Sequence, residues 1–151
     1  MSLMHPLHLN RVQPNKIEPA NPAAGANINI TVPNRQWTLL TSLKFRLTTD
    51  GTAVNRRVIL FATSGADIVW ALPCPDVQGA TSVADYFFWI GHGTPLPAIY
   101  DNIWSGPLPS RNLLEGPESF LTSIVNLQAA DQISNVYGRS EIWHDTVDLT
   151  P

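Results

Sequence analysis

Hydrophobic and polar side chains alternate between residues 36 and 48. Apolar side chains stand at most odd positions, and polar residues fill most of the even ones. Successive side chains of a β-strand point to opposite faces, so this pattern predicts one long, half-buried strand. Its odd face should pack on a hydrophobic core that a second sheet covers. The odd-numbered residues are Trp37, Leu39, Thr41, Leu43, Phe45 and Leu47.

Seven further segments combine strand composition with turn residues at their ends. Short turns separate 56–63 from 67–72 and 119–127 from 132–146, and each of these pairs predicts an antiparallel hairpin. No stretch shows the period of a long helix. The eight predicted strands are 26–32, 36–48, 56–63, 67–72, 82–90, 103–108, 119–127 and 132–146.

Residues 1–25 follow neither a helical nor a strand period, and they contain four prolines. This composition predicts an extended N-terminal arm. Because ordering such an arm costs conformational entropy, we expect either its own domain or a neighbouring subunit to hold it. Residues 26–151 then form the folded domain.

Eight strands in two sheets predict an all-β, single-domain antiparallel β-sandwich, with a jelly-roll-like arrangement as the commonest solution. An immunoglobulin-like sandwich is the alternative, although the chain has only one cysteine and so lacks a cysteine pair. The strand at 82–90 is apolar on both faces. We therefore expect it to be covered on both sides, with the arm or another subunit as the second cover.

The surface is poor in charge, because charged residues make up 14% of the chain against about 25% in an average soluble domain. Such a surface suits packing against other protein. The net charge of −3 and the absence of a run of Lys or Arg argue against a nucleic-acid partner. No apolar run is long enough to span a bilayer and no secretory signal is visible, so we expect a chain made in a cytoplasm with no membrane partner.

The ionisable residues form no recognisable catalytic or metal pattern. His5 and His8 lie on the proline-containing arm, which gives poor ligand geometry. His92 sits between two glycines with no nucleophile elbow nearby, and Glu115 and Glu118 flank a turn rather than a pocket wall. We therefore expect no enzymatic activity, no metal and no cofactor.

Two of the five tryptophans are candidates for contacts with other molecules. Trp37 and Trp70 share strand faces with core-forming residues and are expected to be buried. Trp104 follows a proline-rich loop and Trp143 lies near the C-terminal edge, so both are expected to be exposed. Either could stack on a sugar ring, but an anchor in a protein interface fits a surface this poor in charge better.

Several segments resemble a family of small tailed-phage virion proteins. They are 30–37 (ITVPNRQW) leading into 43–49 (LKFRLTT), then 53–58 (AVNRRV) and 124–132 (IVNLQAADQ). The resemblance implies a jelly-roll-like accessory component of the particle, either a capsid decoration (cement) protein or a neck or tail component. Arg56 and Arg57 begin a strand within these segments, and Asp131 at a predicted hairpin tip is a natural partner for one of them.

The sequence thus predicts a non-enzymatic virion structural protein that stabilises a capsid through contacts between subunits. A neck or tail accessory protein, or a glycan-binding receptor module, is the alternative. The expected partners are the major capsid protein or other virion proteins, together with further copies of this chain as a trimer or dimer. The residues predicted to make contacts are Leu7, Leu9, Val12, Ile17, Arg56, Arg57, Trp104 and Trp143.

Overall fold

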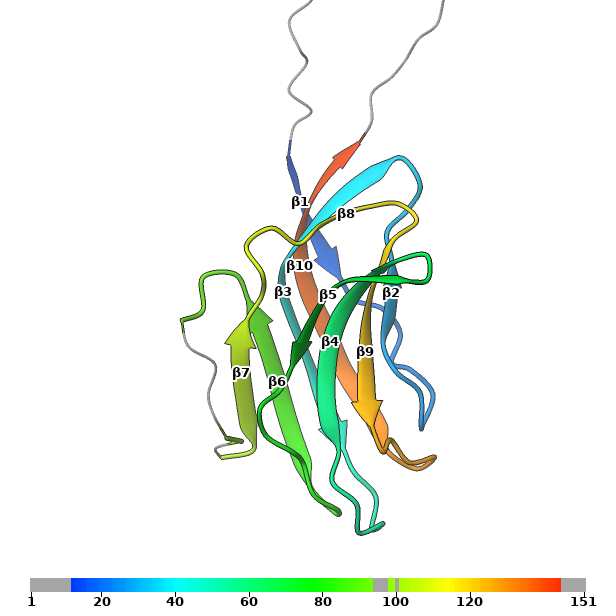
Figure 1. The fold of residues 1–151 in the computed structure, drawn as a ribbon, viewed down its shortest axis with the longest axis vertical. Coiled ribbons are helices and arrows are strands. Elements are labelled where there is room, and N and C mark those ends of the chain that lie inside the picture. Colours follow the sequence, from blue (N-terminus) through cyan, green and yellow to red (C-terminus); the bar gives the residue numbers. More distant parts are fainter. Residues whose placement is uncertain (1–11, 94–97, 100, 145–151) are drawn as a thin grey trace, which may run out of the picture.

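The computed structural model describes residues 12–93, 98–99 and 101–144, and every regular element among them is a strand (Figure 1). The strands form two sheets, as a β-sandwich requires, and the all-β prediction is confirmed. Sheet A has the order β1 (Gln13–Ile17), β10 (Gln132–His144), β3 (Gln36–Thr48), β6 (Val83–Trp89) and β7 (Ile103–Pro107), and β8 (Leu113–Glu115) also pairs with β3. Sheet B has the order β2 (Asn29–Thr31), β9 (Ser119–Val125), β4 (Arg57–Ser64) and β5 (Asp67–Pro73).

The strand pairs are nested along the chain. β1 pairs with β10, β2 with β9, β3 with β6 and β4 with β5, and all four pairs are antiparallel. The chain therefore passes from one sheet to the other between most consecutive strands. β7 and β8 lie between β6 and β9 in the sequence, and β7 pairs in parallel with β6.

One of the two predicted hairpins is wrong. β4 and β5 form the expected antiparallel hairpin. β9, however, bonds to β2 and β4 in sheet B, whereas β10 bonds to β1 and β3 in sheet A. The connection 126–131 therefore joins the two sheets instead of closing a hairpin.

Part of the predicted arm belongs to sheet A. Each of the eight predicted strands overlaps a strand of the structure, but β1 and β8 were not predicted. β1 lies inside the range 1–25 and pairs with β10 of its own chain, so its own domain holds this part of the arm. Because β1 is an edge strand, it tolerates Pro14, which hid the strand signal.

β3 changes the face that it buries half-way along its length. Its pairing with β10 steps from Ser42 to Leu40, so Thr41 is an extra residue in a β-bulge. Even-numbered side chains are buried before the bulge and odd-numbered ones after it. Trp37 and Leu39 therefore lie half-buried on the outer face of sheet A, and the prediction that they line the core is wrong.

The side-chain amide of Asn112 takes the place of a strand neighbour beside this bulge. The N–H of Leu40 donates to Asn112 Oδ1, and Asn112 Nδ2 donates to the carbonyl of Leu40, both at 2.8 Å. On this side of β3, pairing with β6 ends at Ser42 and pairing with β8 begins at Leu39. Buried main-chain groups need partners, and Asn112 supplies them in the gap.

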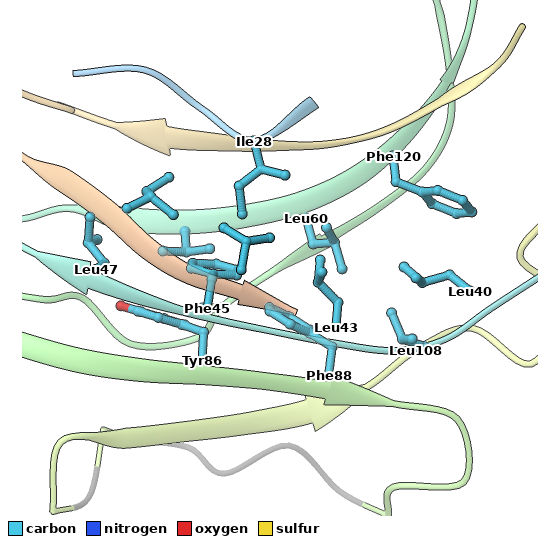
Figure 2. Packing of buried hydrophobic residues seen from close by; sticks show 14 of the residues in the cluster. Ile28, Leu40, Leu43, Phe45, Leu47, Leu60, Tyr86, Phe88, Leu108 and Phe120 are labelled. Carbon is cyan, nitrogen blue, oxygen red and sulfur yellow. The ribbon is translucent and has the colours of Figure 1, made fainter. Parts of the chain in front are cut away.

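The core lies between the two sheets (Figure 2). From sheet A, Phe45 stacks on Tyr86 and Phe88, with ring centroids 5.3 and 6.2 Å apart. Leu60 and Phe120 reach the same layer from sheet B. All five side chains are almost completely buried, so one hydrophobic cluster holds the sheets together.

Trp104 belongs to this core, and its predicted exposure is wrong. It is 0% exposed, and its ring lies 5.3 Å from that of Phe88. β7 sets Trp104 beside Tyr86 on the inner face of sheet A. A Cβ atom at Gly106 would collide with the indole ring, so the glycine makes the room that the ring occupies.

We expect Ile17→Ala to lower the free energy of unfolding by about 2 to 3 kcal/mol, because Ile17 is 9% exposed and packs on the core from β1. Val12→Ala is the matched control, since Val12 is 46% exposed just before β1, and it should change the free energy by less than about 0.5 kcal/mol. Urea unfolding followed by tryptophan fluorescence measures both. Equal stability of the two variants would show that β1 adds nothing to the fold.

Candidate functional site

The described residues include one histidine that contacts a serine hydroxyl. They contain no group of three or more His, Cys, Asp or Glu side chains that could hold a metal ion. His92 Nε2 lies 3.0 Å from the Ser105 hydroxyl, but Ser105 is only 7% exposed. This hydroxyl is therefore buried where it holds the imidazole in place. No helix in the described part of the chain is long and apolar enough to cross a membrane.

The side chain of Arg56 is completely buried, and each of its five N–H donors has an acceptor. Nε and Nη2 donate to the two carboxylate oxygens of Asp131, both at 3.0 Å. Nη1 donates to the carbonyl oxygens of Thr52 at 2.8 Å and Val54 at 2.7 Å. Nη2 also donates to the carboxylate of Asp50. A buried guanidinium is tolerated because none of its donors is left unpaired.

Asp131 is equally well supplied with partners. Besides Arg56, its carboxylate accepts hydrogen bonds from the main-chain N–H groups of Asp50 and Gln128, both at 2.8 Å. Burial raises the pKa of the Asp131 carboxyl. The hydrogen bonds from Arg56 and the two N–H groups lower this pKa by more than burial raises it, so the pKa of Asp131 lies below its usual value. Asp131 is therefore held as a carboxylate inside the fold.

This ion cluster joins two connections that are far apart in the sequence. Asp50 and Arg56 belong to the link between β3 and β4, and Asp131 ends the link between β9 and β10 (Figure 1). The predicted pairing of Asp131 with one of the two arginines is confirmed for Arg56. Because Arg56 has no exposed surface in this fold, its partners are residues of its own chain.

The structure does not gather the other predicted contact residues into one patch. Leu7 and Leu9 lie outside the described residues. Val12 is exposed before β1, Ile17 is in the core, and Trp143 is half-buried opposite Trp37 on the outer face of sheet A. Arg57 is exposed at the start of β4, on the outer face of sheet B.

The outer face of sheet B is largely apolar, which the sequence analysis missed. Ile68, Val69 and Val125 are 64%, 52% and 45% exposed, and Arg57 is the only charged residue at the outward positions of this sheet. β4 has apolar residues on both faces, and this pattern in the sequence could have predicted the apolar outer face of sheet B. The outward positions of β4, β5 and β9 include Arg57, Ile59, Phe61, Thr63, Ile68, Ala71, Pro73, Leu121, Ser123 and Val125.

The outer face of sheet A has a different composition. Val83 and Trp89 on β6 and Ile103 on β7 are 41%, 40% and 43% exposed. The expected second cover of β6 is therefore not supplied by the described part of the chain. Lysine and arginine side chains lie among the aromatic ones on this face, in contrast to sheet B.

Comparisons of the chain with protein-family models, with curated proteins and with solved structures found no match. No family is therefore assigned.

We expect Asp131→Asn to lower the free energy of unfolding by about 3 to 5 kcal/mol, because it leaves the buried charge of Arg56 without its main partner. Asp85→Asn is the control. It also breaks a two-bond pair with an arginine, Arg46, but this pair is on the surface, so stability should change little. Chemical denaturation of the two variants measures the difference. Similar losses in both would contradict a special role for the buried cluster.

We also expect stability to fall in acid. Because the pKa of Asp131 is lowered in the folded state, its contribution is fully present above the ordinary aspartate pKa of about 3.9 and is lost as the pH falls through the folded value. Unfolding measured between neutral pH and pH of about 2.5 should show this decline. Asp131→Asn should flatten the pH dependence, and an unchanged slope would be the contrary result.

Proposed function

We propose that this chain is a non-enzymatic structural protein of a bacteriophage virion, specifically a capsid decoration or cement protein that stabilises the shell through contacts between subunits. The observation that carries this proposal is the apolar, almost uncharged outer face of sheet B. The fold leaves Ile68, Val69 and Val125 about half or more exposed there. The resemblance of several segments to small tailed-phage virion proteins supports the same role.

The composition of this face matches the centre of a protein interface. Interface centres are depleted in charged residues, and arginine is the charged residue that they favour. Phe61 and Leu121 lie side by side on the outer face, with Ile59 and Val125 nearer to Arg57. A stable interface of standard size buries about 1,600 Å² in total, and repetition over a symmetric shell multiplies the effect of each contact.

The free edge of sheet B supports contacts between copies of the chain. β5 is the last strand of that sheet, and along its seven residues only one edge is paired, with β4. Exposed edge strands readily pair with another chain. The other end of the sheet is β2, which has three residues. We propose a homo-dimer or trimer in which β5 contributes to the contact.

The nested strand pairs support a jelly-roll arrangement as part of this proposal. In such a fold, a long antiparallel ribbon wraps so that its paired strands fall alternately in two sheets. β1 to β6 with β9 and β10 would form the eight-stranded roll, with β7 and β8 as an addition to sheet A. Jelly rolls occur in viral capsids and in lectins, so the arrangement is compatible with the proposed role. A position in the neck or tail of the particle is the alternative within the same class.

The test uses particles of the phage that encodes the chain. Mass spectrometry of purified virions should find the chain, and particles assembled without it should bind added wild-type protein. Ile68→Asp should weaken this binding about tenfold or more, because it places an unpaired charge in an apolar contact. Co-sedimentation with the particles measures the affinity.

Val83→Asp is the matched control, because Val83 is also a strand residue with an exposed apolar side chain, but on the outer face of sheet A. This variant should bind particles as the wild type does. Absence of the chain from purified virions, or equal binding by Ile68→Asp and the wild type, would overturn the proposal.

A further inference from the structure

Two neighbouring hollows lie on the outer face of sheet A. The first has a volume of about 350 Å³ and opens over β10, β3 and β6. The second has a volume of about 300 Å³ and opens over β1, β10 and β3. Tyr137 on β10 lines both, so the two hollows adjoin at this residue, and we refer to them together as the groove.

Aromatic side chains form the walls of the first hollow. Trp89 and Phe87 on β6 stand on one side of it and Tyr137 on the other, with Ser42 and Lys44 of β3 between them. Ser42 is paired with Trp89 on one side and with Arg139 on the other, so a short side chain in the row leaves the space open. Trp89 is 40% exposed, and its ring is steadied by the His92 imidazole at 4.1 Å between centroids.

Polar side chains line the second hollow. Thr41 in the bulge of β3, Lys16 on β1, and Arg139 and Glu141 on β10 surround it. The Thr41 hydroxyl donates to the carbonyl of Arg139 at 2.9 Å, which keeps the floor of the hollow in place. The groove thus offers ring faces at one end and hydrogen-bonding groups at the other.

Positive charge is concentrated where the two hollows meet. The ammonium groups of Lys16 and Lys44 lie 5.7 and 5.4 Å from the centroid of the Tyr137 ring. Lys16 also pairs with Glu18, at 2.7 Å. Lys44 and Arg139 make no salt bridge within the described residues, so both are available to an anionic ligand.

We infer that this groove binds an acidic oligosaccharide. A sugar ring presents a C–H face that packs on aromatic rings and a rim of hydroxyls that needs polar partners, and the two hollows supply these two surfaces side by side. Lys44 and Arg139 would pair with carboxylates on the sugar. Trp89 and Tyr137 are two strands apart and two residues out of register, a separation of about 12 Å, which a short oligosaccharide spans.

Carbohydrate fits the groove better than the other two ligand classes. Nucleic acid requires a continuous basic surface, whereas the chain has a net charge of −3 and Glu141 lines the groove. A flat protein partner would leave two hollows of this size unfilled. The groove lies on the sheet opposite the apolar face used in the proposed function, so the two inferences are independent.

The test is binding of the full chain to an array of immobilised oligosaccharides that carry uronate, carry sialate or are neutral. Acidic glycans should bind at least tenfold more tightly than neutral ones. Trp89→Ala should weaken binding at least tenfold by removing the stacking surface, and Lys44→Gln should reduce the preference for acidic glycans. Ile68→Asp, on the other sheet, should bind glycans as the wild type does.

Absence of binding, equal binding of acidic and neutral glycans, or full binding by Trp89→Ala would overturn the inference. If the array stays blank while Lys44→Gln weakens attachment to particles, the face contacts an acidic protein surface and the carbohydrate site is wrong. Loss of particle binding by Ile68→Asp with glycan binding intact would support both inferences separately.

Discussion

The buried pair of Arg56 and Asp131 is the interaction on which the rest of the structure depends. A charged guanidinium can stay inside a protein only while all of its donors are satisfied. Here the acceptors come from the β3–β4 connection and from the β9–β10 connection. Both connections carry the chain from one sheet to the other, so the cluster forms only when the two sheets are correctly placed. It therefore specifies the relation between the sheets, while the apolar core between them supplies most of the driving force.

The two sheets share one core but differ in their outer faces. Sheet B exposes aliphatic side chains with a single cation, Arg57, and this suits a dry contact with another protein. Sheet A exposes aromatic rings among lysines and arginines, and its surface is hollowed where Ser42 lies between larger side chains. One small domain thus has room for a structural contact on one side and ligand binding on the other.

Local patterns in the sequence were sufficient for eight of the ten strands in the described residues, but not for the partners of those strands. Alternation and turn residues located eight strands, because these signals are local. The face of Trp37 was wrong because a bulge at Thr41 shifts the alternation by one residue, and no residue type marks a bulge uniquely. Trp104 was wrongly predicted to be exposed, because its burial depends on the pairing of β7 with β6. The pairing of Arg56 with Asp131 could be predicted from their opposite charges. The groove could not be predicted, because it combines residues from four strands that only the fold brings together.

The pairing of the first strand with the last has a consequence for how the protein is made. Asn15 on β1 hydrogen-bonds to Ser140 on β10, 125 residues later. Native contacts of such long sequence separation are expected to form slowly, because a large loop must close first. During synthesis, β1 leaves the ribosome long before its partner and stays unpaired until β10 has emerged. The sandwich is therefore expected to become stable only once β10 is available, and any chain that ends before β10 is exposed to proteolysis and aggregation.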